Sequence, residues 1–143
     1  MKFDRLKEIR EERNLTQREV ADALEVERST YAGWETGKDT IPLRRLNKLS
    51  DYYKISVDYM TGLSNVTSSY RVIDLDAKVI GQNLKEFRKE RNLVQKDIFL
   101  FLNTTSSTYS AYETGKVLIK TDFLYSICKN YNASMDELLG KKN

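Results

Sequence analysis

A short polar stretch at residues 28–33 carries side chains suited to recognising the edge of a planar ligand. Arg28 and Ser29 open it, and the small residues Ala32 and Gly33 follow at helical spacing. A guanidinium offers two parallel N–H donors, which match the paired acceptors on the edge of guanine, and a serine hydroxyl can bond to a base or to a phosphate. The small side chains of Ala32 and Gly33 would let this stretch approach its ligand closely. The chemistry that this stretch favours is polar recognition.

Catalytic chemistry has few residues available. The chain has no histidine and a single cysteine, Cys128, so we expect no metal site, no disulfide and no histidine-based triad. None of the 21 acidic residues stands in a recognisable catalytic context. The sequence therefore predicts a protein that is not an enzyme and has no cofactor.

The polar stretch must lie on a helix if its side chains are to face one way. Tyr31, Trp34 and Glu35 are spaced to form the opposite, inward face, and Gly37 is suited to end the helix in the left-handed conformation. A second short helix is predicted just before it, since Thr16 followed by Glu19 is a capping-box signature. Two short helices joined by a tight turn indicate a helix-turn-helix.

An internal repeat shows that the chain holds two copies of this unit. A gapless shift of 78 residues matches about 23 of 59 positions between residues 4–62 and 82–140. Each copy reads as five short helices, and no strand is required. We predict an all-α fold of two tandem domains, at residues 1–63 and 78–143, joined by a Ser/Thr/Asn-containing linker at 64–77 that spans at most ~46 Å.

The repeated motif resembles the lambda-repressor/Cro-type (XRE-like) helix-turn-helix family. The resemblance rests on residues 15–21, 28–38 and 56–62 of the first copy, and it extends over about nine-tenths of the chain. It implies two tandem five-helix lambda-repressor-like domains that bind double-stranded DNA, with the helix beginning at Arg28 in the major groove. It further implies ion pairs between Arg10 and Glu35 and between Arg88 and Glu113.

Candidate DNA contacts follow from the exposed stripe and from the resemblance. In the first copy they are Thr16, Gln17, Arg18, Arg28, Ser29, Thr30, Ala32, Gly33 and Lys38. In the second copy they are Gln95, Lys96, Ser106, Ser107, Ser110 and Lys116. For Gln17 a purely capping role is an equal alternative, and for Lys38 the alternative is a solvated surface charge, which is the usual role of such residues.

The second copy differs where DNA would be read. Ser106 replaces the arginine, Val94 replaces the Thr16 cap, and Leu100 and Phe101 stand at positions that should be partly exposed. Exposed apolar residues indicate a protein contact. Against this, residues 65–143 carry 12 basic and 9 acidic residues whereas residues 1–64 carry 12 of each, so the second copy keeps charge for phosphate contacts.

Length, composition and net charge limit the class of protein to which the chain can belong. The 143 residues, 40% hydrophobic and 31% charged with a net charge of +3, are typical of a folded chain that leans towards polyanions. No apolar run approaches the ~18 residues that cross a membrane, and no signal-peptide core is present, so we expect a cytoplasmic protein without a membrane segment.

Together these features predict a sequence-specific transcriptional regulator that binds double-stranded DNA, and a repressor in particular. The two units would bind as a pseudo-dimer, or the second would dimerise or bind a partner while the first reads DNA. The competing class is a protein-interaction or antitoxin-like module.

Overall fold

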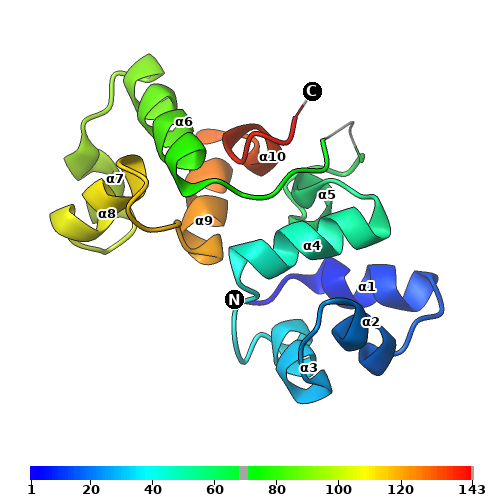
Figure 1. Ribbon diagram of the computed structural model, residues 1–143. Coiled ribbons are helices and arrows are strands. Elements are labelled where there is room, and N and C mark those ends of the chain that lie inside the picture. Colours follow the sequence, from blue (N-terminus) through cyan, green and yellow to red (C-terminus); the bar gives the residue numbers. More distant parts are fainter. Residues whose placement is uncertain (68–70, 143) are drawn as a thin grey trace. The chain divides into compact units, whose positions relative to one another are not determined.

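The computed structural model describes residues 1–67 and 71–142, and it divides into two compact units, Met1–Ser69 and Tyr70–Asn143. In unit 1 the helices are α1 (Asp4–Glu12), α2 (Gln17–Ala23), α3 (Arg28–Thr36), α4 (Leu43–Tyr53) and α5 (Val57–Thr61). In unit 2 they are α6 (Ala77–Glu90), α7 (Gln95–Phe101), α8 (Ser106–Glu113), α9 (Thr121–Tyr131) and α10 (Met135–Leu138) (Figure 1). The predicted all-α fold with five helices in each unit is confirmed for the described residues.

The core of unit 1 explains why these short helices form. Every helix contributes a stripe of buried residues at helical spacing, and burial of these stripes stabilises helices too short to be stable alone. The buried side chains include Leu6, Ile9, Val20, Leu24, Tyr31, Leu46, Leu49 and Met60. Unit 2 repeats the arrangement with Leu84, Ile98, Tyr109, Leu124, Ile127 and Cys128.

The ends of α2 and α3 follow the predicted local signals. Thr16 accepts from the backbone N–H of Glu19 while the Glu19 carboxylate accepts from the N–H of Thr16, both at 3.1 Å. Gly37 ends α3 with a φ of 83°, in the left-handed region. The order of capped α2, turn and glycine-terminated α3 fixes the helix-turn-helix locally.

The starts of α4 and α6 have different caps. Pro42 is the N-cap of α4 and makes no side-chain cap bond. Helix α6 has 14 residues against 9 for α1, because Asp76 caps it with a carboxylate bond to the N–H of Lys78 at 2.9 Å.

The longer α6 is possible because Gly81 lets it pass very close to α8. A Cβ at Gly81 would lie 2.4 Å from the backbone oxygen of Tyr112 and 2.6 Å from that of Glu113. Only a residue without a side chain fits at that crossing. The position of unit 1 that matches Gly81 is Phe3, which lies before α1.

Both ends of the predicted linker are hydrogen-bonded to a unit. Arg5 donates to the backbone oxygen of Ser64 and to Oδ1 of Asn65. The backbone N–H of Arg71 donates to Lys141, and its guanidinium donates to the oxygen of Gly140 at 3.0 Å. Residues 68–70 of the linker, like residue 143, lie outside the described residues.

Candidate nucleic-acid interface

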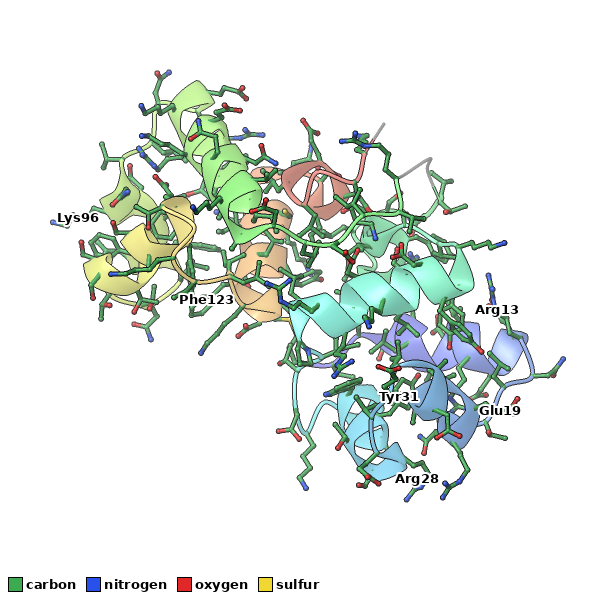
Figure 2. All side chains as sticks on the ribbon, viewed as in Figure 1. Arg13, Glu19, Arg28, Tyr31, Lys96 and Phe123 are labelled. Atoms are coloured by element: carbon green, nitrogen blue, oxygen red, sulfur yellow. The ribbon has the colours of Figure 1, made fainter. Side chains whose placement is uncertain are left out.

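Helix α3 presents one buried face and one open face. Tyr31, Trp34 and Glu35 are buried as predicted, and the rings of Tyr31 and Trp34 meet edge to face at 6.0 Å. Arg28 is exposed at the tip of α3, whereas Tyr31 points into the unit (Figure 2). The packing therefore holds α3 by its aromatic side and leaves its first turn open.

A buried ion pair ties α1 to α3. Nε of Arg10 lies 2.7 Å from Oε2 of Glu35, and its Nη2 lies 3.0 Å from Oε1, so the contact is bidentate. A third donor, Nη1 of Arg10, bonds to the backbone oxygen of Leu15 at 2.9 Å. The side chains are only 12% and 3% exposed, so this predicted pair is confirmed and is well shielded from water.

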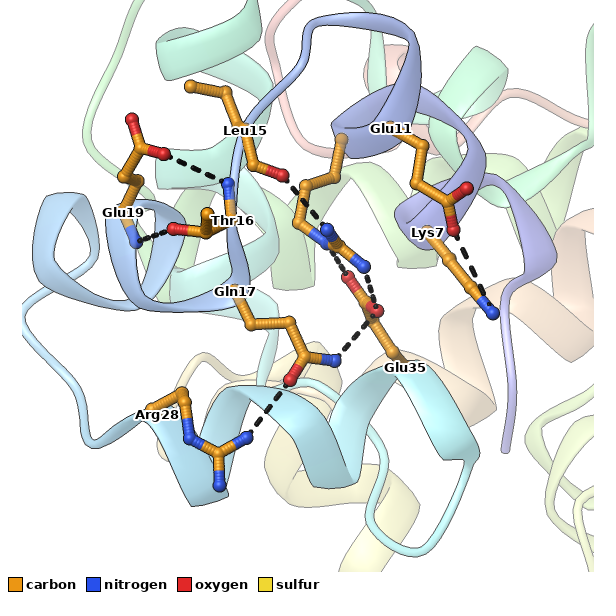
Figure 3. A network of polar contacts seen from close by, with 9 residues as sticks. Lys7, Glu11, Leu15, Thr16, Gln17, Glu19, Arg28 and Glu35 are labelled. Carbon is orange, nitrogen blue, oxygen red and sulfur yellow. Dashed lines mark hydrogen bonds and ion pairs between the residues drawn. The ribbon is translucent and has the colours of Figure 1, made fainter.

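The ion pair continues outwards to the tip of α3 through Gln17. Nε2 of Gln17 donates to Oε1 of Glu35 at 3.1 Å, and Oε1 of Gln17 accepts from Nη1 of Arg28 at 3.1 Å (Figure 3). Because a carboxylate only accepts and a guanidinium only donates, the amide has one orientation that satisfies both neighbours. Gln17 thus links the buried Glu35 to the exposed Arg28.

Glu35 is charged in this network. Burial raises the pKa of its carboxyl group, but the hydrogen bonds from Arg10 and Gln17 favour the charged form and hold the pKa below its usual value. Glu113 behaves in the same way through Arg88 and Gln95. Each carboxylate can therefore anchor a glutamine at neutral pH.

Acid should weaken both units through these carboxylates. Because their pKa values are lower in the folded than in the unfolded chain, their stabilisation is present in full at neutral pH and is lost as the pH falls through the folded values. The carboxyl ¹³C NMR signals of Glu35 and Glu113 in the wild-type chain should titrate below the usual range of a glutamate, and Tm should fall over the same pH interval. Titration within or above the usual range would show that the two carboxylates do not control the acid response.

Unit 2 contains the same network without its outer end. Arg88 and Glu113 are paired at 2.8 and 3.0 Å, and Nε2 of Gln95 donates to Glu113 at 3.1 Å. Ser106 occupies the place of Arg28, and its short side chain carries no guanidinium. Unit 2 keeps the internal support and has no arginine at the tip of α8.

The remaining predicted contact residues lie mostly on the surface. The exposed ones are Thr16, Arg18, Ser29, Thr30, Lys38, Lys96, Ser106, Ser107 and Lys116, and the partly exposed ones are Gln17, Ala32, Gln95 and Ser110. Lys96 extends outwards from α7 (Figure 2). Among the predicted exposed positions of α3, Gly33 is an exception: it is buried, because Asp39 and Lys38 from the segment after α3 lie over it.

The cap of α7 has one of the two hydrogen bonds that form the capping box of α2 in unit 1. The carboxylate of Asp97 accepts from the N–H of Val94 at 2.8 Å, as Glu19 does for Thr16. Val94 has no oxygen to return the bond. The replacement of Thr16 by Val94 therefore removes only the side-chain half of the cap.

The structure adds one relation that the sequence did not reveal. Gln17 was predicted as a cap or a phosphate contact, and Glu35 as half of an ion pair, but their bond and its extension to Arg28 were not foreseen. The sequence signal for the bond between Gln17 and Glu35 was that Gln17 recurs as Gln95 in the copy where Arg10 and Glu35 recur as Arg88 and Glu113.

No group of acidic, cysteine or histidine side chains within residues 1–67 and 71–142 could hold a metal ion. In the same residues, every helix is too short or too polar to span a bilayer.

Comparison with known proteins agrees with the geometry. A helix-turn-helix family model matches residues 6–60, and a helix-turn-helix domain model matches residues 81–143. The uncharacterized HTH-type transcriptional regulator YobD of Bacillus subtilis is 33% identical over 93 residues, which are 65% of this chain and 76% of YobD. A search of solved structures found no match.

Two further relatives extend this picture. The HTH-type transcriptional regulator ImmR of Bacillus subtilis is 31% identical over 69% of this chain and 72% of its own length. Antitoxin PezA of Streptococcus pneumoniae is 29% identical over 44% of this chain and 40% of its own length. With two matching domain models, and with two regulators that are 33% and 31% identical over 76% and 72% of their own length, the chain belongs to the XRE-type helix-turn-helix family of DNA-binding transcriptional regulators and is not an enzyme.

Proposed function

We propose that this regulator is a repressor that reads a DNA sequence by placing α3 of unit 1 in the major groove. The observation that carries the proposal is Arg28, an exposed guanidinium on the open tip of α3 that is oriented by Gln17. One of its nitrogen atoms bonds to Gln17, and its other N–H donors can bond to N7 and O6 of guanine. Holding the side chain in place beforehand reduces the entropy that binding must overcome.

The neighbouring exposed residues fit contacts to the DNA backbone. Arg18 and Lys38 carry the charges for phosphate contacts, and Thr16, Ser29 and Thr30 supply hydroxyl groups. Ala32 lies on the partly exposed side of α3 and lets the helix approach the bases. Gly33, being buried, is left out of this contact surface.

Unit 2 would add weaker contacts. Its exposed α8 residues Ser106 and Ser107, together with the partly exposed Ser110, carry hydroxyl groups and no charge. Gln95, Lys96 and Lys116 would contact phosphates, and such contacts contribute affinity without reading sequence. Unit 1 is therefore the main reader. Binding would repress transcription if the bound site overlaps a promoter. We expect the protein to act in the cytoplasm, where bacterial DNA lies.

The test is to select the preferred sequence of the full chain from a random pool and to measure two variants on it. Arg28→Ala should weaken specific binding by about 1–3 kcal/mol and relax the preference at one base pair. Lys38→Ala is the matched control, because it should weaken all sequences similarly and reduce the salt slope by about one unit. Unchanged specific affinity in Arg28→Ala would remove the proposed reading residue.

A second candidate function is a protein-interaction module of the antitoxin kind. It is favoured by the exposed Leu100 and Phe101 of unit 2 and by the similarity of part of the chain to an antitoxin. A chain with this function alone would select no sequence from the random pool, which separates the two candidates.

A further inference from the structure

The first half of the linker is hydrogen-bonded to unit 1. Nη1 of Arg5 donates to the backbone oxygens of Tyr59 and Ser64. Its Nη2 donates to Oδ1 of Asn65 at 2.6 Å, and the guanidinium lies 4.4 Å from the centre of the Tyr59 ring. Two residues beyond Asn65, Oγ1 of Thr67 accepts from the backbone N–H at the N-cap of α5, at 3.5 Å. The linker therefore follows unit 1 as far as Thr67.

Unit 2 shows that the fold itself does not require this arginine. The position of unit 2 that matches Arg5 is Asn83, which donates to the backbone oxygen of Leu138 in α10 at 3.0 Å. An asparagine therefore suffices to join the first and last helices of a unit. In unit 1 the longer arginine reaches past α5 to the linker, so its presence is explained by the linker rather than by the fold of the unit.

The second half of the linker is bound to unit 2. The backbone N–H of Arg71 donates to the oxygen of Lys141, and its guanidinium donates to the oxygen of Gly140 at 3.0 Å. Cδ1 of Ile73 would lie 3.7 Å from a Cβ at Gly140, and Leu75 is buried. The linker is therefore bound to unit 2 from Arg71 onwards.

These contacts leave only a short tether between the units. The chain from Thr67 to Arg71 can span at most ~14 Å, whereas residues 64–77 could span ~46 Å if all of them were free. The tether sets the effective concentration of a second binding unit, which falls roughly as the −3/2 power of tether length. Binding the linker to both units therefore raises the effective concentration of unit 2 at a duplex that unit 1 occupies.

We propose that the bound linker makes the two units act together on one DNA duplex, with Arg5 and Arg71 as the residues that hold it. Both are positioning residues, since neither has to contact DNA for this role. The proposal rests on the phosphate contacts proposed for unit 2, and it does not depend on which bases α3 reads.

A linker variant of the full chain tests the proposal. Asn65→Ala/Thr67→Ala/Arg71→Pro removes three side chains that bind the linker and, because proline has no N–H, the backbone bond of residue 71. Arg5 stays in place, so the fold of unit 1 is spared. The free tether grows from about four residues to about 9–11, and affinity for a duplex of about 40 base pairs should fall about three- to fivefold.

Two duplexes separate this proposal from the reading of sequence by α3. One carries the site selected from the random pool, and the other has an unrelated sequence. The loss of affinity is expected on both, because phosphate contacts do not depend on sequence. A chain that reads no sequence would still show the loss on the unrelated duplex. The matched control is Val66→Ala/Val72→Ala, at exposed linker side chains, which should bind as wild type does.

Removing the phosphate contacts of unit 2 shows whether the tether acts through them. Lys96→Ala/Lys116→Ala should weaken binding by itself, and adding the linker variant to it should cause no further loss. A general disturbance of the fold would instead add its own loss in both backgrounds. Independent losses, or a linker variant that binds as tightly as wild type, overturn the proposal.

NMR relaxation tests the bound linker without DNA. In wild type the backbone amides of residues 65–67 and 72–73 should be as ordered as those of α5 and α6 on the ps–ns timescale. In the linker variant these amides should become mobile while the helices stay ordered, which also verifies that both units are folded. Mobile linker amides in wild type would overturn the proposal.

Discussion

Replacing Glu35 with alanine is expected to unfold unit 1 at temperatures where the wild-type unit is folded. The substitution leaves the shielded guanidinium of Arg10 without its bidentate partner and releases Gln17. Removal of one partner of a buried ion pair costs about 3–5 kcal/mol. A unit of this size has a small reserve of stability, so the loss takes most of it.

Two-dimensional NMR of the full chain checks this result, because it reports on each unit separately. The amide signals of unit 1 should collapse in Glu35→Ala while those of unit 2 persist. Lys7→Ala is the control: its ion pair with Glu11 is exposed, with 3.7 Å between the charged atoms, and its loss should cost less than about 0.5 kcal/mol. An intact unit 1 in Glu35→Ala would mean that the network orients the helices without stabilising them.

Gly81→Ala is expected to destabilise unit 2 by about 3 kcal/mol or more. The added methyl group would lie 2.4 Å from one backbone oxygen of α8 and 2.6 Å from the next, and backbone atoms cannot move aside as a flexible side chain can. The effect opposes the usual trend, since alanine in a helix interior is about 1 kcal/mol better than glycine.

Gly33→Ala provides the matched helical control. A Cβ there would lie 3.4 Å from a side-chain oxygen of Asp39, an ordinary contact, so the variant should be neutral or slightly stabilising. Urea unfolding followed by circular dichroism measures both changes. If Gly81→Ala is as stable as wild type, α6 and α8 do not pack as closely as described.

Much of the fold could be predicted because its signals are local. The capping pair of Thr16 and Glu19 and the glycine at position 37 mark the ends of α2 and α3, and the inward spacing of Tyr31 and Trp34 sets the rotation of α3. The internal repeat extends the order of the helices and their inward positions to the second unit, although the Thr16 cap and Arg28 are replaced there by Val94 and Ser106. These features depend on neighbours within a few residues along the chain.

The errors and omissions involve neighbours that are distant along the chain or in an irregular segment. Gly33 fits an outward stripe by periodicity, but the segment after α3 folds back over it. Gly81 matches no glycine in unit 1, so the repeat gave no indication of the close crossing with α8. The bond of Gln17 to Arg28 joins two helices and depends on the position of Glu35, which periodicity does not give.

The most direct measurement is a cycle that pairs Arg28→Ala with single base-pair changes in the selected DNA site. Affinities of both proteins are measured for the preferred site and for each altered site at one salt concentration. We predict that one guanine position loses about 1–3 kcal/mol with wild type and nearly nothing further with Arg28→Ala. If the losses add independently at every position, Arg28 does not read a base and α3 is not used as proposed.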